Sequence, residues 1–383
     1  MSAQKAEQNL NEGFKSGSPE AEYVGTQRKR IMFLVSMCII LLFSFIAALS
    51  IGAIDIPFFE TAKIVLNNFM FGIFGAPEQE YYETAIMTLR MPRILLCLIT
   101  GASLGMAGAI MQGVLRNPLV SPFTLGVSTA ASFGAAIAIV LGSSILGGSY
   151  YAAISLFGLS FTLDQLIKTV FAFIFGMSSI FLVVVLARNT TVSRSTIILS
   201  GVIISYIFQA GLMFMKYISD DTQLRDITMW IMGGFSGTTW STIAIVLPIV
   251  IIGGIYLEKL SIDINMLASG DDVASNLGIN VQKLRNNGMI VSTLITTVCL
   301  AFTGTIGFVG LMAPHICRML IGNDARFLLP ASALFGAIIL VLSDLFARIV
   351  LRPSELPVGI IMYIIGGAFF IWLVFGKKVG GST

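Results

Sequence analysis

The sequence predicts an all-α polytopic membrane protein with about ten transmembrane helices, since each crossing needs roughly 20 apolar residues. Of the 383 residues, 56% are hydrophobic and only 11% are charged. Soluble domains carry roughly a quarter charged residues. The apolar residues are also grouped in long runs, which leave no room for a sizeable soluble domain. This organisation excludes a self-contained cytosolic enzyme.

The chain begins with a polar tail, residues 1–30, which ends in Arg28-Lys29-Arg30 just before the first apolar run at residues 31–54. A signal peptide would have a shorter polar head and a shorter apolar core. We therefore expect a retained first span with its basic edge in the cytoplasm. The transmembrane domain extends over residues 31–378, and residues 379–383 form a C-terminal tail.

Further apolar runs predict the remaining spans. Two of them are short and contain Gly or Pro, which is tolerated only where protein or water surrounds the freed backbone. An even number of spans places both termini on one side. With that side in the cytoplasm, fifteen of the 23 Lys and Arg residues are cytoplasmic, in agreement with the positive-inside rule. The runs are residues 94–115, 125–142, 167–187, 195–215, 239–257, 287–304, 307–322, 327–350 and 356–376, of which 125–142 and 307–322 are the short ones.

Two external connections have a distinctive composition. Residues 55–88 are acidic and predict a solvated loop with a short amphipathic helix. Residues 143–163 are apolar enough to form a re-entrant or interfacial segment. The acidic side chains of the first connection are Glu60, Glu78, Glu80 and Glu83.

The cytoplasmic connection of residues 261–283 predicts a short helix. Ser269 and either Asp271 or Asp272 can cap its start, and Gly278 can end it. A short helix held in a cytoplasmic loop is suited to docking a partner.

The second span carries a stripe of small residues at four-residue spacing, Gly101, Gly105, Ala109 and Gly113. Such a stripe lets two helices approach closely. A second interpretation is that this helix borders a pathway to which Gln112 contributes a polar group. Both interpretations can hold together.

Asp344 lies inside an apolar run, four residues before Arg348, so the two side chains can meet on one helical face. We expect a structural ion pair near the external end, from which Arg348 and Arg352 reach outward. An ionisable group inside the membrane is also a functional candidate. The alternative function is therefore an ion-gradient-driven secondary transporter that uses Asp344.

The chain offers no constellation for catalysis or for a metal. His315 is the single histidine and has no acid or thiolate at ligand spacing. The four cysteines are far apart in apolar runs and predict buried hydrophobic residues. No basic, aromatic-interleaved stretch predicts nucleic-acid binding, and no GxxxxGK[ST] motif occurs, so ATP would have to bind another subunit. The cysteines are Cys38, Cys97, Cys299 and Cys317.

Arg90 and Arg93 lie where the chain enters the second span from outside, with Pro92 at a first helical position. They can anchor the helix in the membrane interface. Alternatively, they can form a cationic ring with Arg348 that receives acidic groups of an external partner.

Seven segments of the chain have a distinctive sequence. They read RMPR at 90–93, GASLG at 101–105, QGVLRNPLVSPFTLGVS at 112–128, WIMGGFSG at 230–237, LGIN at 277–280, GFVGLMAPHICR at 307–318 and PSELPVG at 353–359. Together, and in this order, they resemble the permease subunits of iron-siderophore and cobalamin ABC importers. The resemblance covers about residues 31–378.

The resemblance implies the permease architecture of a type II ABC importer in a bacterial inner membrane. Such a permease pairs with a second copy or a paralogue around a central pathway. Two ATPase subunits, which carry the ATP and Mg, lie on its cytoplasmic side, and a substrate-binding protein docks outside. The implied cargo is a ferric siderophore or a similar metal chelate, and the chain itself holds no cofactor.

The resemblance also assigns residues to three roles. Residues 270–278 correspond to the helix that couples the permease to the ATPase, and the external arginines correspond to a docking site for the binding protein. The coupling residues are Ser269, Gly270, Asp271, Asp272, Val273, Ala274, Asn276, Leu277 and Gly278; the docking residues are Arg90, Arg93 and Arg348; the pathway and gate candidates are Gly105, Gln112, Arg116, Asn117, Pro118, Trp230 and Gly233.

Three segments depart from the family pattern. The N-terminal tail is longer, residues 143–166 are longer and more apolar, and Ala268-Ser269-Gly270 replaces the expected Leu-Gly pairing before the coupling helix.

Overall fold

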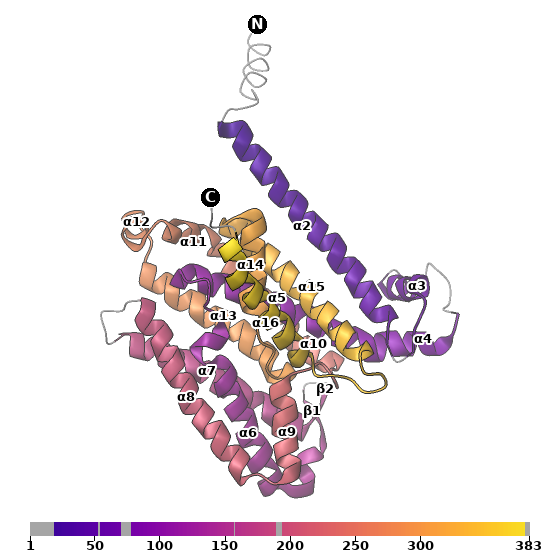
Figure 1. Ribbon diagram of the computed structural model, residues 1–383. Helices are drawn as coiled ribbons and strands as arrows, with labels where there is room; N and C mark the ends of the chain where they lie inside the picture. Colours follow the sequence, from indigo (N-terminus) through magenta and orange to yellow (C-terminus); the bar gives the residue numbers. More distant parts are fainter. Residues whose placement is uncertain (1–18, 53, 70–77, 157, 189–193, 380–383) are drawn as a thin grey trace.

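The structure is a computed structural model that describes residues 19–52, 54–69, 78–156, 158–188 and 194–379 (Figure 1). Within these ranges nine helices are long and apolar enough to span a membrane, and α14 is a shorter apolar helix. The predicted all-α membrane fold is confirmed. The ten helices are α2 (Pro19–Ser50), α5 (Met91–Leu115), α6 (Val127–Leu146), α7 (Leu163–Arg188), α8 (Arg194–Ile218), α10 (Trp240–Lys259), α13 (Val281–Thr303), α14 (Val309–Ile321), α15 (Ala325–Ile349) and α16 (Val358–Val379).

Short elements connect these helices. They are the helices α3 (Phe58–Phe69), α4 (Glu80–Thr84), α9 (Asp221–Met232), α11 (Ser261–Ala268) and α12 (Asp271–Asn276), the π-helical turn Ala85–Arg90, the 3-10 turns Pro122–Leu125 and Gly147–Tyr151, and the strands β1 (Ala153–Leu156) and β2 (Leu159–Thr162).

The long helices alternate in direction, so α2 begins and α16 ends on the same side of the bundle (Figure 1). We name this side the termini end, and it also carries α11 and α12. The opposite side, the far end, carries α3, α4, α9 and the antiparallel hairpin of β1 and β2. The two ends therefore hold different connecting structures.

Helix α5 forms the centre of the bundle because its small residues let other helices approach it. A Cβ atom on Gly101 or Gly105 would overlap the backbone of α15, and one on Gly108 would overlap the carbonyl of Gly310 in α14. The side chains of α5 are mostly buried, including Gln112. The close packing predicted for the small-residue stripe is confirmed at Gly101 and Gly105.

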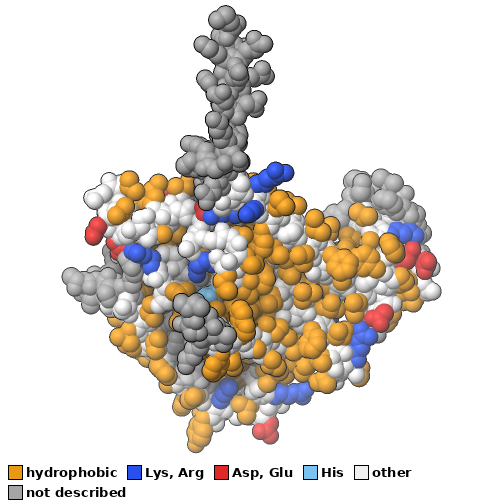
Figure 2. All heavy atoms as spheres, turned by 45° about the horizontal axis from the view of Figure 1, so that its top comes forward, with side chains coloured by type: hydrophobic (Ala, Val, Ile, Leu, Met, Phe, Trp, Pro, Cys, Tyr) orange, Lys and Arg blue, Asp and Glu red, His pale blue; other side chains and the backbone are white. Residues whose placement is uncertain are grey.

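The outer helices present apolar side chains at their surface, and Figure 2 shows a hydrophobic surface over much of the bundle. Helix α2 is the least buried span, since only 11% of its most apolar window lies inside the molecule. Helix α8 exposes a second apolar row, which includes Tyr206, Ile207 and Phe214. Exposed apolar faces of this size are suited to contact with a membrane or another protein.

Several elements differ from those predicted. Residues 143–163, for which a re-entrant or interfacial segment is expected, contain the end of α6, the 3-10 turn Gly147–Tyr151 and the hairpin of β1 and β2. The expectation itself stays a prediction. Helix α9 was not predicted because it is too polar for a span; Asp220 and Gln223 form a capping box at its start. The connection of residues 55–88 contains the amphipathic helix α3, as predicted.

Candidate functional site

The connection between α10 and α13 folds into the two short helices α11 and α12. Helix α12 has Gly270 as its N-cap residue at φ 133°, a conformation that favours glycine. Gly278, at φ 88°, ends the helix with backbone hydrogen bonds to its last turn. The short helix predicted over residues 270–278 is therefore confirmed. The predicted caps are wrong. Ser269 ends α11, and Asp271 and Asp272 lie inside the first turn of α12, whose N-cap is Gly270.

Helices α11 and α12 expose apolar side chains at the termini end, which we name the α11–α12 surface. Ala274 points inward and is buried, whereas its neighbours Asp272 and Val273 are exposed. A cavity of about 350 Å³ lies beside this surface, between the two short helices and Arg326. The exposed apolar residues are Ile262, Met266, Val273 and Leu277.

Asp271 connects α12 to the bundle through two arginines. Its Oδ2 lies 2.7 Å from Nη2 of Arg285, and its Oδ1 lies 3.7 Å from Nη1 of Arg116. The Arg285 side chain is 7% exposed, and its Nε donates to the carbonyl of Val114 at 3.1 Å. One guanidinium thus joins α12, the start of α13 and the last turn of α5. We name Asp271, Arg285 and Arg116 the termini-end cluster.

Sequence reasoning missed Arg285 as a site residue. Arg285 was included only among the fifteen Lys and Arg residues expected on the cytoplasmic side. The sequence carried no signal for it, because Arg285 precedes the apolar run of residues 287–304 and lies among polar residues.

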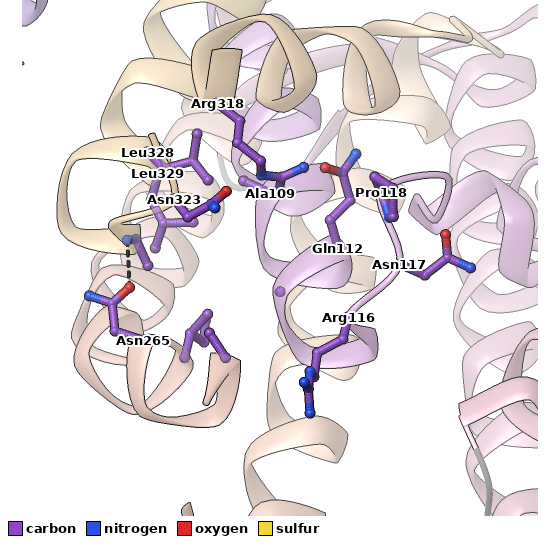
Figure 3. A pocket seen from close by; sticks show the side chains of 14 residues that line it. Ala109, Gln112, Arg116, Asn117, Pro118, Asn265, Arg318, Asn323, Leu328 and Leu329 are labelled. Carbon is purple, nitrogen blue, oxygen red and sulfur yellow. Dashed lines mark hydrogen bonds between the residues drawn. The ribbon is translucent and has the colours of Figure 1, made fainter. Parts of the chain in front are cut away.

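The loop that follows α5 starts with Arg116 in the left-handed conformation, at φ 49°. The side-chain oxygen of Asn117 accepts a hydrogen bond from the backbone N–H of Leu119 at 2.9 Å. Gln112, Arg116, Asn117 and Pro118 all line one cavity at the termini end (Figure 3). The structure therefore brings together four of the seven pathway and gate candidates.

The other three candidates lie elsewhere. Gly105 is in the interior, against the carbonyl of Ser332. Trp230 and Gly233 are at the end of α9, where they line a far-end cavity of about 240 Å³ together with Arg93. The pathway role of all seven residues stays a prediction.

Helix α2 is attached to the termini end through Asp324. Arg30 lies 3.1 Å from this carboxylate and also donates to the carbonyl of Ile321. The hydrogen bond from the Arg326 side chain lowers the pKa of Asp324 to about 2, and Asn265 donates a further bond. Because the folded-state pKa is depressed, the stabilisation is present above the ordinary pKa near 3.8 and is lost as the pH falls through about 2.

The far end contains a buried group of charges that we name the far-end cluster: Asp344, Arg93, Arg348 and Glu355. Oδ1 of Asp344 accepts from Nη2 of Arg93 at 2.9 Å, and Arg348 Nε lies 3.0 Å from Oδ2 without the alignment of a hydrogen bond. Arg93 also pairs with the more exposed Glu355 at 2.7 Å. The ion pair predicted between Asp344 and Arg348 is confirmed.

The side chains of Arg348 and Arg90 cap the C-terminal end of α2. Arg348 donates to the carbonyls of Ala48 and Ile51, and Arg90 donates to those of Leu49, Ser50 and Ile54. Helix C-termini leave carbonyls without partners, and cations stabilise them. The expectation that Arg348 reaches outward is wrong, because these carbonyls and Asp344 hold it inside.

The predicted docking arginines thus all have partners within the chain. Arg352, by contrast, is exposed and pairs with the exposed Asp55 at 3.2 Å. The hydrogen bond from Arg352 lowers the pKa of Asp55. Docking of an external protein to Arg90, Arg93 and Arg348 stays a prediction.

Among the residues that the structure describes, no three His, Cys, Asp or Glu side chains lie together as a potential metal site. The imidazole of His315 packs against Phe369 and Phe370, with ring centroids 5.9 and 6.5 Å apart.

Comparison with known proteins extends this description over almost the whole chain. The model of the FecCD transport family matches residues 40–376. The hemin transport system permease protein HmuU of Yersinia pestis is 32% identical over 360 residues, which cover 92% of this chain and 98% of that protein. The Fe(3+) dicitrate transport system permease protein FecD of Escherichia coli is 34% identical over 327 residues, covering 85% and 93%.

A solved structure is similar in fold. It is described as an inward-facing conformation of an ABC transporter of the metal-chelate type, and it matches with a TM-score of 0.74 and 28% identity. The match covers 90% of this chain and 98% of that one.

Proposed function

The chain belongs to the FecCD transport family and is the membrane-spanning permease subunit of an ABC transporter, and from this premise we propose that it imports an iron chelate. The supporting observation is the match along the whole length to permeases named for hemin and for ferric dicitrate. The chain is a transporter component and not an enzyme.

We propose that the termini end is cytoplasmic and that ATPase subunits bind there. The 15 to 8 distribution of Lys and Arg supports this orientation, and Figure 2 shows basic side chains near the start of α2. The α11–α12 surface offers Val273 and Leu277 as exposed apolar contacts beside the charge of Asp272. ATP and Mg would then be held entirely by the partner subunits.

In this proposal the termini-end cluster transmits movement from the ATPase to the bundle. A displaced α12 moves Asp271, which is paired with Arg285 and lies near Arg116. Arg285 in turn bonds the last turn of α5 at Val114, and Arg116 begins the loop that follows α5. The path from partner to membrane helix therefore passes through a few charged groups.

We propose that two copies, or this chain and a paralogue, enclose the pathway. The exposed apolar row of α8, with Tyr206 and Phe214, and the exposed face of α16, with Trp372 and Phe375, are available for such an interface. The far end would receive the substrate-binding protein, with the far-end cluster behind it and Glu355 at its surface. The siderophore class of the cargo is part of the same proposal.

The secondary-transporter alternative is not supported. Both oxygens of Asp344 face arginines within 3.0 Å, and the residue is 1% exposed. A proton or ion relay needs a carboxylate that can exchange its partner. The comparisons all lead to ABC permeases instead.

Reconstitution tests the proposal. The chain would be placed in proteoliposomes with its cognate ATPase and binding protein, and uptake of ferric chelates, hemin and cobalamin would be measured. We expect uptake of an iron chelate that requires ATP and both partners. Two outcomes would contradict the proposal: uptake that an ion gradient drives without the ATPase, or transport of a substrate that contains no metal.

A further inference from the structure

A cavity of about 290 Å³ lies at the termini end, between the last turn of α5, α11, α14 and the start of α15 (Figure 3). Its lining includes the side chains of Arg116 and Arg318 and contains no Asp or Glu. Asn323 also lines it. In Figure 3 the guanidinium of Arg116 is directed away from Arg318, and it lies 3.7 Å from the carboxylate of Asp271. Arg318 is therefore the cation that faces this space, and because the lining holds no carboxylate the cavity favours an anion.

Arg318 is the residue of α14 that enters this cavity. Figure 3 shows its guanidinium directed towards Gln112 of α5. Arg93, Arg285 and Arg348 each face a carboxylate within about 3 Å. The partly buried Arg90 instead donates to three backbone carbonyls. Arg318 is partly buried and forms no ion pair with any residue that the structure describes. An anion in the cavity would supply the missing partner.

Gln112 supplies the second group. Its side chain is 3% exposed, and its Nε2 donates to the carbonyl of Leu311 at 3.4 Å. This bond turns Oε1 to the cavity, where the oxygen is buried and accepts no hydrogen bond from the described residues. A buried acceptor without a donor is costly, so the site also favours a ligand with an O–H group.

We propose that this cavity binds hydrogen phosphate, with Arg318 holding its anionic oxygens and Gln112 accepting its O–H. Arginine presents a planar fork of donors that suits carboxylate and phosphate alike. An ionised carboxylate or a sulfate has no proton to give to Gln112, whereas inorganic phosphate near neutral pH keeps at least one. A phospholipid with a phosphomonoester headgroup presents the same chemistry, so the experiment separates the free ion from the lipid.

Bound phosphate would add a further connection between helices that already pack against each other, as Gly108 of α5 does against Gly310 of α14. Arg318 is on α14, Gln112 is on α5, and α11 forms the remaining side. Because α11 leads directly into α12, an occupied cavity would stabilise the position of the α11–α12 surface against α5.

Binding of inorganic phosphate to the purified full-length chain in detergent, without its ATPase, tests the proposal by calorimetry, with sulfate as the matched anion. We expect saturable phosphate binding that is tighter than sulfate binding. Arg318→Gln should weaken it roughly tenfold or more, since hydrogen bonds to charged groups are the stronger ones. Gln112→Met should remove the preference for phosphate over sulfate. Lys259→Gln, an exposed cation at the termini end that does not line the cavity, should leave the affinity unchanged.

The melting temperature and elution volume of each variant show whether it is folded. Arg318→Lys keeps the positive charge but loses the planar guanidinium, so it should bind phosphate with intermediate affinity. The proposal is overturned if wild-type protein shows no saturable phosphate binding, or if phosphate and sulfate bind equally and Arg318→Gln changes neither. In nanodiscs, phosphatidate is compared with phosphatidylglycerol. Loss of phosphate binding with phosphatidate alone would overturn the free ion as the ligand and assign the site to the lipid headgroup.

Discussion

Each end of the bundle contains a carboxylate between two arginines, but the two groups differ in burial. In the far-end cluster, Asp344 is 1% exposed and lies on the long helix α15. In the termini-end cluster, the side chain of Asp271 is 36% exposed and lies on the six-residue helix α12. A buried ion pair is costly to break, whereas an exposed one exchanges readily with water. The comparison indicates a fixed far end and a termini end that can move.

Asp344→Asn should have the largest effect, because it leaves Arg93 and Arg348 buried without their shared carboxylate. We expect the free energy of unfolding to fall by about 3–5 kcal/mol, the usual cost of breaking a buried pair. Thermal unfolding in detergent and the yield of monodisperse protein measure it. The matched control is Asp271→Asn, for which we expect a loss of about 1–2 kcal/mol, because only part of that carboxylate is desolvated. Equal losses at both positions would remove the distinction between the two ends.

Asp271→Asn should mainly weaken the coupling between ATP hydrolysis and uptake. The neutral side chain weakens the pairs with Arg285 and Arg116, so movement of α12 reaches α5 less completely. We expect ATP-driven uptake in proteoliposomes to fall by roughly tenfold, about 1.4 kcal/mol, while ATP hydrolysis by the complex continues. Asp272→Asn is the control, since this exposed neighbour has no ion pair with a described residue. Parallel losses of uptake and hydrolysis would assign Asp271 to ATPase binding rather than to transmission.

Asp272→Arg should affect the contact with the ATPase more than the contact with the binding protein. The substitution reverses a charge on the exposed face of α12. Charges at the edge of an interface mainly change the rate at which the partner associates. We expect the affinity for the ATPase to fall several-fold, as measured by co-purification and by titration in detergent. Affinity for the substrate-binding protein at the far end should not change. Unchanged ATPase affinity would remove α12 from the docking surface.

Much of the fold could be predicted because it depends on local apolar length. The ten apolar runs match the ten helices, and even the short run with Pro314 is a helix. Helix α9 could not be found in this way, since its polar capping box and low hydropathy are typical of a surface helix. The hairpin of residues 153–162 also escaped, because its alternating pattern is only four residues long in each strand.

The site was predictable in its elements but not in its partners. Gly278 indicated where α12 ends, and the spacing of Asp344 and Arg348 predicted their pair. Arg285 is 14 residues from Asp271, and Arg93, the second arginine at Asp344, is 251 residues from it. Such pairs depend on which helices pack together, and neither periodicity nor spacing contains that information.

Arg352→Gln should have the smallest effect, and it separates burial from location as the cause of the difference between the ends. Arg352 lies at the far end, as Asp344 does, but its pair with Asp55 is exposed on both sides. We expect the free energy of unfolding to change by less than about 1 kcal/mol. The pKa of Asp55, which the Arg352 hydrogen bond lowers, should return towards its ordinary value near 3.8. Because the folded-state pKa is the depressed one, the small stabilisation is present at neutral pH and is lost as the solution becomes acidic. A loss as large as that of Asp344→Asn would show that the far end is rigid throughout, and that burial of the carboxylate is not what distinguishes the two clusters.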